Sequence, residues 1–334
     1  MKTLHSKSLC CGAKVYRFGG RRRQCAKCHK TWRIRAKKRG RKLVRVHPNI
    51  KQTVITRRES LRQWADRGGK GREVVRRRHR RNLEALLKRL PKMRAPNGPL
   101  IAVIDGWCIY PKGQRHIVYL ILLRPVKGKY ATIMEPVILP GWEGKQRWEK
   151  VLRSLPPDVL KRIKALVVDG ITGVECLAND WGWVVQRCHF HQIAMVQTLR
   201  GNRWGTVKQK PLREQIYQNV LNMLRTPDEI EAQELYRQTK RLIKLPNCPR
   251  WIRLRVGGCI RRLDYFRSYR KYPELNLSTT TNSAECVFQK VTEMSRLTRG
   301  FRTIESFKLW LNVQLRNMKY VRCNGKIFNQ NSMS

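Results

Sequence analysis

Short apolar runs and longer helical patterns alternate through the middle of the chain. Two of the runs, at residues 100–104 and 165–168, are almost uninterrupted and rich in β-branched residues, which is typical of buried strands. Each leads directly into Asp-Gly, at Asp105 and Asp169. An aspartate at the end of a buried strand lies where a pocket can open at the sheet edge, although Asp-Gly is also a common turn sequence.

From residue 100 the pattern predicts three consecutive strands, followed by alternating helices and strands. The expected strands are 100–105, 117–123, 130–139, 165–169 and 184–187, with helices at about 145–163 and 173–181. Beyond His191 the pattern is helical and basic over 212–225, 228–245 and 251–272, and a last helix runs from about Ser283. We therefore expect an α/β chain whose mixed-sheet core is ribonuclease H-like, with an all-helical insertion.

The first and fourth strands are neighbours in such a sheet, so Asp105 and Asp169 are expected to meet. Paired carboxylates can hold two Mg²⁺ or Mn²⁺ ions roughly 3.5–4 Å apart for phosphodiester chemistry. A third carboxylate is needed, and Glu285 in the segment 279–285 is the candidate, ahead of Glu293 and Glu305. The alternative is structural, because Glu285 can also close a capping box with Asn282 as N-cap.

Cys188 and His191 directly follow the expected strand at 184–187. A cysteine and two histidines, Cys188, His189 and His191, suggest a second metal site, but no nearby knuckle completes a tetrahedral set. We therefore favour packing, or a role in orienting the catalytic carboxylates from behind.

Charge points to nucleic acid as the partner. The chain has 73 Lys and Arg against 22 Asp and Glu, a net charge of +51, and its first acidic residue is Glu59. No apolar stretch reaches the roughly 18 residues of a membrane span, and no signal peptide follows Met1. We expect no membrane association. The expected location is the cytoplasm, with the nucleoid, in a prokaryote, or the nucleus in a eukaryote.

The N-terminal cysteines have the spacing of a zinc ribbon. Cys11, Cys25 and Cys28 fit two knuckles around a structural Zn²⁺, but Ser8 occupies the position where the first knuckle would need another cysteine. Cys10 is the first choice for the fourth ligand, with His5 or His29 as alternatives. The seven other cysteines are scattered singly, which suits reduced thiols.

A basic stretch at 36–58 predicts an extended linker or a solvated tail. Ala65, Gly69 and Val75 then have the spacing of a helix-turn-helix, although a basic helix joining two domains fits equally well. The arginines expected to face DNA are Arg76, Arg77, Arg78, Arg80, Arg81 and, further on, Arg299. The resulting division is a zinc ribbon (1–35), a basic linker (36–58), a helix-turn-helix-like segment (59–98), the first part of the core (99–191), a helical insertion (192–277), the last core helices with Glu285 (278–320) and a tail (321–334).

These motifs together resemble the Mutator-like superfamily of DDE transposases, including related bacterial insertion-sequence enzymes. The matching elements are Ile104-Asp105-Gly106, Val168-Asp169-Gly170, Cys188 to His191, Thr281 to Glu285 and Arg299-Gly300-Phe301. The segment from Gln24 to Trp32 is similar to zinc ribbons of insertion-sequence proteins, and the irregular first knuckle is the main departure. The resemblance implies that Asp105, Asp169 and Glu285 bind the catalytic metals.

The resemblance also implies the reaction and the partners. The N-terminal modules would bind terminal inverted repeats, and the core would cleave one strand and join its 3′ end to target DNA. Work on two DNA ends favours a homodimer. The alternative from another class is a DNA-binding regulator or domesticated relative that does not cleave; a structure-specific or RNA-guided nuclease is a third possibility. Aromatic and basic residues alternate over 261–272, where stacking on a DNA base competes with simple packing.

Overall fold

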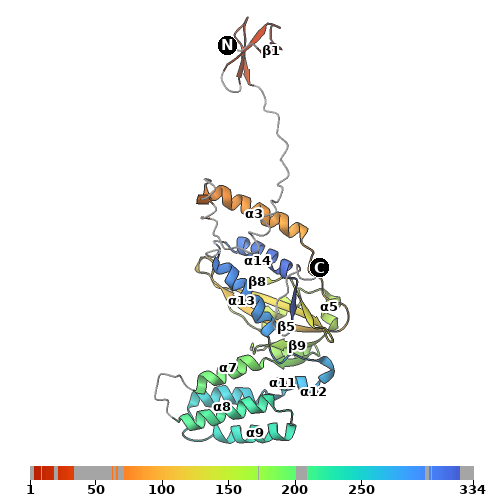
Figure 1. Cartoon of the computed structure of the whole chain (residues 1–334), viewed down its shortest axis with the longest axis vertical. Coiled ribbons are helices and arrows are strands. Elements are labelled where there is room, and N and C mark those ends of the chain that lie inside the picture. The colour runs from red at the N-terminus through yellow and green to blue at the C-terminus, as the bar shows by residue number, and fades with distance from the viewer. Residues whose placement is uncertain are drawn as a thin grey trace. The chain divides into compact units, whose positions relative to one another are not determined.

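The computed structural model describes residues 4–8, 10–18, 22–33, 62, 65–66, 71–171, 173–200, 209–297, 301 and 303–323 of the chain. The chain divides into two compact units, Met1–Arg45 and Val46–Ser334. Figure 1 shows the elements of both.

The N-terminal unit contains a small antiparallel sheet in chain order. Its strands are β1 (Leu4–Lys7), β2 (Lys14–Arg17), β3 (Arg22–Cys25) and β4 (Thr31–Arg33). Val15 and Cys25 are its buried apolar side chains among the described residues. So few apolar side chains make a very small core, and a sheet of this size needs another source of stability.

Helix α3 (Arg72–Arg89) carries the arginine cluster and is amphipathic. Its buried positions, including Val75, Leu83 and Leu86, follow helical spacing. They pack toward α14 (Ile304–Met318), and Arg316 of α14 donates to the Leu87 carbonyl. Ala65 is helical and buried. Gly69 lies outside the described residues, so the predicted helix-turn-helix stays a prediction.

Among the described residues, seven strands form the mixed sheet of the second unit. Six of them run in the order β10-β9-β5-β6-β7-β11, and β8 pairs with β6. Strands β5, β9 and β10 are mutually parallel, and β6, β7, β8 and β11 pair antiparallel. Their bounds are β5 Leu100–Ile109, β6 His116–Pro125, β7 Tyr130–Ile133, β8 Val137–Pro140, β9 Ile163–Val168, β10 Val184–Arg187 and β11 Tyr320–Arg322. The α/β class is thus confirmed, and so is the pairing of the predicted strands 100–105 and 165–169, which are β5 and β9.

Three details of the sheet differ from the prediction. β5 continues to Ile109 instead of ending at Asp105, because its partner β6 keeps pairing with it as far as His116. The expected strand 130–139 is split into β7 and β8. Residues 320–322, at the start of the predicted tail, form β11 on the edge of the sheet, where they pair with Tyr130–Thr132 of β7.

Helices cover both faces of the sheet, as Figure 1 shows for α13 and α14. One face packs against α3, α13 (Asn282–Leu297) and α14 through side chains such as Val103, Val167 and Trp310. The other face packs against α4 (Lys145–Leu152), α5 (Pro157–Arg162) and α6 (Val174–Asp180). The predicted helix 145–163 is therefore two helices, since Pro156 and Pro157 interrupt it.

The helical insertion follows β10 and has its own apolar core. Its helices are α7 (His189–Arg200), α8 (Lys210–Arg225), α9 (Glu229–Leu242), α10 (Arg250–Ile260), α11 (Leu263–Phe266) and α12 (Ser268–Lys271). The expected helix 251–272 is thus three shorter helices, and the helical pattern begins at His189 instead of after His191. Within the described part of the chain, no helix combines the length and apolarity that crossing a membrane requires.

Candidate active site and cysteine cluster

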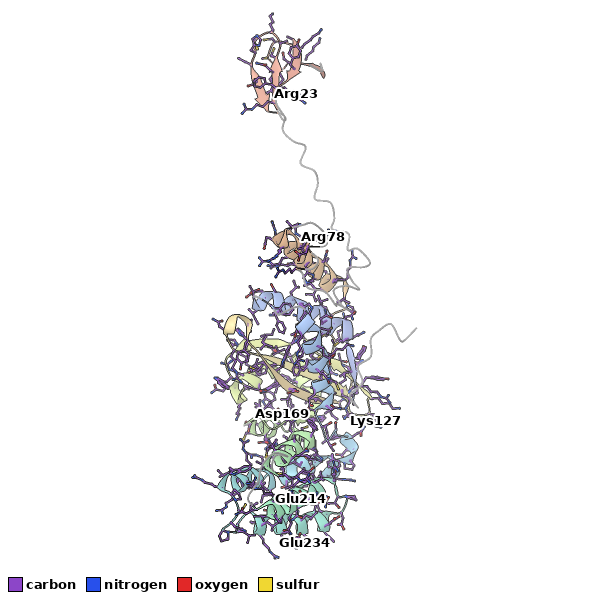
Figure 2. All side chains as sticks on the ribbon, turned by 60° about the vertical axis from the view of Figure 1, so that its left-hand side comes forward. Arg23, Arg78, Lys127, Asp169, Glu214 and Glu234 are labelled. Carbon is purple, nitrogen blue, oxygen red and sulfur yellow. The ribbon has the colours of Figure 1, made fainter. Side chains whose placement is uncertain are left out.

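Asp105 and Asp169 occupy equivalent positions along two neighbouring parallel strands: Asp105 lies within β5, and Asp169 directly follows the end of β9. The last paired positions of β5 and β9 are Val103 and Val167, and each aspartate lies two residues further along the chain. Side chains alternate between the faces of a sheet, so each aspartate shares the face of its valine. Both valines belong to the core beneath α13. Figure 2 shows Asp169 where the sheet adjoins the helical insertion.

The carboxylates of Asp105 and Asp169 repel each other in a largely buried site. Asp105 is 8% exposed, and burial together with the charge of Asp169 raises its pKa well above the ordinary range. Burial also raises the pKa of Asp169, against the opposing charges of His191 and Arg187. Among the described residues, Oδ1 of Asp169 is buried without a hydrogen-bond partner. A divalent cation would relieve this repulsion and satisfy that oxygen, and carboxylates are suitable ligands for Mg²⁺ or Mn²⁺.

Glu285 lies in the first turn of α13, on the helix that covers this face. Phe288, one turn further along, contacts Trp107 with ring centroids 5.8 Å apart. Trp107 is two residues from Asp105 on β5 and therefore shares its face, and positions 285 and 288 share a helix face. The face of α13 that carries Glu285 is thus turned toward β5 near Asp105.

The contacts of Glu285 differ from the expected capping box. The helix begins at Asn282, and the Thr281 carbonyl accepts from the N–H groups of Ala284 and Glu285, so Thr281 occupies the cap position. The Thr281 hydroxyl donates to Glu285 Oε1 over 3.1 Å, and His191 Nδ1 lies 3.5 Å from the same oxygen. Glu285 therefore interacts with the start of its own helix and also reaches the first turn of α7.

Cys188 and His191 form a polar pair beside the carboxylates. Burial raises the pKa of Cys188, but hydrogen bonds with His191 and from the Thr281 N–H outweigh it, so the pKa is lowered. The hydrogen bond to Cys188 raises the pKa of His191 to about 9, with Asp169 and Glu285 adding to the rise and burial opposing it. The imidazolium of His191 thus adjoins Glu285 and lowers the pKa of Asp105 and Asp169.

The ligand atoms of Cys188, His191 and Glu285 also lie within 4.8 Å of one another, close enough for one metal ion. The second-metal interpretation therefore remains alongside an orienting role. In the orienting role, the His191 cation holds Glu285 on one side and screens the aspartates on the other.

Glu143 is a fourth carboxylate at this site, which the sequence did not reveal. It precedes α4, and Trp148 Nε1 donates to its Oε1 over 2.8 Å. Burial and the charge of Asp169 raise the pKa of Glu143, and Glu143 in turn raises that of Asp105. Its carboxylate lies against Gly106, where a methyl group would be 2.7 Å from the Glu143 Cδ. Gly106 is thus needed for space.

Gly170 has a different role. Its φ of +127° is a conformation that side chains rarely adopt, and a methyl group there would be 3.1 Å from the Arg187 Cζ. Arg187 is in turn held by Glu175, 3.1 Å from its Nη1. The glycine lets the chain turn sharply after Asp169 while a buried arginine packs beneath it.

The predicted DNA-facing arginines of α3 are all exposed: Arg76, Arg77, Arg78, Arg80 and Arg81. Two of them pair with Glu73 and one with Glu84 of the same helix. Figure 2 shows Arg78 on this helix. Arg299 lies outside the described residues.

The aromatic residues of 261–272 mostly pack inside the protein. Phe266 is buried in the core of the helical insertion, and Tyr269 forms an edge contact with His189. Arg267, 1% exposed, binds Glu229. The packing explanation therefore fits this segment better than base stacking, which would need exposed rings.

The N-terminal cysteines converge as their spacing predicts. One sulfur from each of Cys10, Cys11, Cys25 and Cys28 lies within 4.8 Å of the others, a possible metal-binding cluster. His29 is not part of this group, and the side chain of His5 lies outside the described part of the chain. The Ser8 hydroxyl is 3.2 Å from Cys25 Sγ and lowers the pKa of that thiol to about 6.

Ser8 also explains the irregular first knuckle. Its hydroxyl accepts from the backbone N–H groups of Cys11 and Ala13, which shapes the turn that presents Cys10 and Cys11. The serine at the position of a missing cysteine therefore contacts the cluster without supplying a sulfur.

No protein-family model matches the chain, and no curated protein is significantly similar to it in sequence.

Proposed function

We propose that the protein is a ribonuclease H-like DNA transposase that cleaves DNA strands and transfers their 3′ ends. The observation that carries this proposal is the equivalent placement of Asp105 within β5 and Asp169 directly after the adjacent parallel strand β9, under the helix that carries Glu285. The order β10-β9-β5-β6-β7, with only the β5, β9 and β10 strands parallel, supports a ribonuclease H-like core.

Asp105, Asp169 and Glu285 would hold two Mg²⁺ or Mn²⁺ ions, which supply Lewis-acid activation and neutralise charge on the phosphate. Asp105 and Asp169 are fixed by the sheet, so the chain positions its acidic ligands before DNA binds. His191, with its raised pKa, keeps Glu285 oriented and limits the repulsion among the carboxylates. The Thr281 N–H donates to Cys188 and so ties the start of α13 to that residue, while the Thr281 hydroxyl donates to Glu285.

The same acidic cluster would serve both chemical steps. Attack by water cleaves a strand, and attack by the freed 3′-hydroxyl joins that strand to target DNA, so only the nucleophile changes. The exposed arginines of α3 would hold double-stranded DNA by its phosphates. Cys10, Cys11, Cys25 and Cys28 would hold a structural Zn²⁺ that folds the N-terminal unit for binding terminal inverted repeats.

The decisive experiment measures Mg²⁺-dependent cleavage and strand joining on DNA that carries the element's own ends. Asp169→Asn should abolish both steps while leaving DNA affinity nearly unchanged. Asp264→Asn is the matched control, since Asp264 is exposed and pairs with Lys271. Equal activity of Asp169→Asn and the parent protein would refute the mechanism.

The second candidate is a DNA-binding regulator that keeps the fold without cleaving. The exposed arginines of α3 fit this candidate equally well, because they need no catalysis. Tight binding to the ends with no Mg²⁺- or Mn²⁺-dependent cleavage would favour it. Cleavage that depends on DNA structure or on a guide RNA, without joining, would favour a nuclease instead. A homodimer on paired ends is expected for the transposase, and sedimentation of the DNA complex measures it.

A further inference from the structure

A cavity of about 320 Å³ lies on the second unit, formed by three segments far apart in the sequence. These are the turn between β6 and β7, the loop before α13, and β11. The polar side chains that line it are Arg124, Lys129, Asn276, Ser278, Arg322 and Cys323. No acidic residue lines it within the described part of the chain, so its charge is strongly positive.

Arg124 is the unusual member of this group, because it is a buried cation without a carboxylate partner. It is 4% exposed, and burial lowers its pKa. Its guanidinium donates to the backbone carbonyls of Gly128, over 3.2 Å, and Asn276. Among the described residues, it forms no ion pair with an acidic side chain.

Arg267 shows how the same chain treats another buried arginine. It is 1% exposed, and Glu229 Oε2 accepts from its Nη2 over 2.8 Å and from its Nε over 3.0 Å. Buried charges are normally compensated in this way, because an unpaired one is costly. Arg124 has carbonyl partners only, and the two further cations beside it increase the need for an anion.

We propose that this pocket binds a phosphate group of a nucleic-acid strand. The Arg322 guanidinium and the Lys129 ammonium group suit phosphate oxygens, and the Asn276 amide can donate as well, whereas the Ser278 hydroxyl already donates to the Thr280 carbonyl over 2.8 Å. The cavity is at the lower end of the usual size of small-ligand sites, about 300–1,000 Å³, so it accommodates a phosphate with part of its nucleotide. A chain with net charge +51 makes nucleic acid the fitting source of that phosphate.

The pocket is linked to the candidate active site by a short stretch of chain. Asn276 and Ser278 line the pocket, and Thr281, a few residues later, contacts both Cys188 and Glu285. A phosphate bound between β11 and this loop therefore restrains the segment that positions Glu285. The proposal that the pocket binds phosphate does not depend on the proposed cleavage reaction. Only the proposed coupling between the pocket and Glu285 rests on that reaction.

The test uses the full-length protein and Cys323 as a local probe. Iodoacetamide alkylation of Cys323 is followed by peptide mass spectrometry, with exposed Cys176 on α6 as the reference thiol. Bound phosphate should slow alkylation of Cys323 by covering it and by disfavouring its thiolate. The ligands are a short DNA duplex, a single strand of the same sequence, and inorganic phosphate at matched ionic strength.

Two variants distinguish DNA binding in the pocket from nonspecific attraction of DNA to the positive charge of the protein. Lys129→Gln with Arg322→Gln removes the pocket's outer cations, whereas Lys127→Gln removes one charge from the same turn outside the pocket (Figure 2). DNA should protect Cys323 several-fold in the parent protein and in Lys127→Gln, but not in the double variant. The double variant should also lower the salt dependence of DNA binding, by about 0.9 in the log–log slope for each phosphate that the protein no longer neutralises.

Three results would overturn the proposal: equal protection of Cys323 in the parent and the double variant, equal protection of Cys176 and Cys323, or protection by inorganic phosphate but not by DNA. The last would assign the pocket to a free ion. Protection without any strand cleavage would leave the pocket intact and count against the transposase. Strand cleavage without protection of Cys323 would support the transposase and count against the phosphate pocket.

Discussion

Replacing Asp105 by asparagine should stabilise the metal-free protein while removing its chemistry. Asp105 is buried, and burial and Asp169 raise its pKa. A carboxyl with a higher pKa in the folded state binds its proton more tightly when folded. Its contribution to stability is therefore complete below the unfolded-state pKa and is lost as pH rises through the folded-state pKa. At neutral pH, above the unfolded-state pKa, Asp105 thus destabilises the fold relative to an uncharged side chain of the same shape.

The size of the effect follows from two opposing contributions. Each unit of pKa difference between the folded and unfolded states corresponds to about 1.4 kcal/mol. Asparagine keeps the acceptor for the Gly106 N–H, 2.8 Å away in the native protein, but adds a buried amide whose missing partners cost about 1 kcal/mol. Stabilising substitutions commonly gain about 0.5–2 kcal/mol in the free energy of unfolding, and we expect a net gain of this order at pH 7.

The assay is urea unfolding followed by tryptophan fluorescence, since Trp148 and Trp310 are fully buried in the second unit. It is run at pH 5 and pH 7 without added divalent ions, and again with Mg²⁺. The advantage of Asp105→Asn should shrink at pH 5. Mg²⁺ should stabilise the parent protein much more than the variant. Asp264→Asn, at an exposed surface pair, should change stability by less than about 0.5 kcal/mol.

A variant less stable than the parent protein at pH 7 without metal would refute the electrostatic reasoning. Equal stabilisation of both proteins by Mg²⁺ would refute the assignment of Asp105 as a ligand.

Three further predictions concern other features of the two units. Gly106→Ala should displace the Glu143 carboxylate and lower the free energy of unfolding by about 1–3 kcal/mol, measured by urea unfolding. Gly144→Ala is the control, because a methyl group there meets open space, and an equal loss of stability in both variants would contradict the prediction. Cys188→Ala should lower the pKa of His191 from about 9 toward 6.5, which NMR titration measures. The stability that the pair of Cys188 and His191 contributes should therefore be lost as pH rises through about 9 in the parent protein, but not in the variant. Cys25→Ser should release Zn²⁺ from the N-terminal unit, measured by a metallochromic dye, while the melting of the second unit stays unchanged; retained Zn²⁺ would exclude the cluster.

The sequence predicts the backbone framework of this protein well, because strands and their order depend on apolar periodicity. The runs at 100–104 and 165–168 are buried strands, and their pairing follows from the order of elements. Periodicity did not show that β5 continues through Asp105 and Gly106, because Asp-Gly reads as a turn unless a partner strand keeps pairing with it. Pro156 and Pro157 could have revealed the break between α4 and α5.

The candidate site was only partly predictable for a different reason. Asp105 and Asp169 each follow a recognisable apolar run, and Glu285 lies in the first turn of a recognisable helix. Glu143 has no such signal, since it lies in a loop and matters only because Gly106 leaves room for its carboxylate. In the sequence, Arg124 looks like an ordinary strand residue. That it is a buried cation without a carboxylate partner is evident only from the structure, where segments distant in sequence come together.

The placement of α13, α14 and β11 has a consequence for how the protein is made. These elements come late in the chain, yet together with α3 they cover one face of the sheet, and β11 completes its edge. At about 5–20 residues per second, a ribosome needs on the order of ten seconds to proceed from Asp169 to Glu285. During that interval α13 and α14 do not yet cover the sheet face, and the two aspartates lack Glu285. Under the proposed function, the nascent chain would therefore be able to hold DNA by its basic N-terminal part before it could cut.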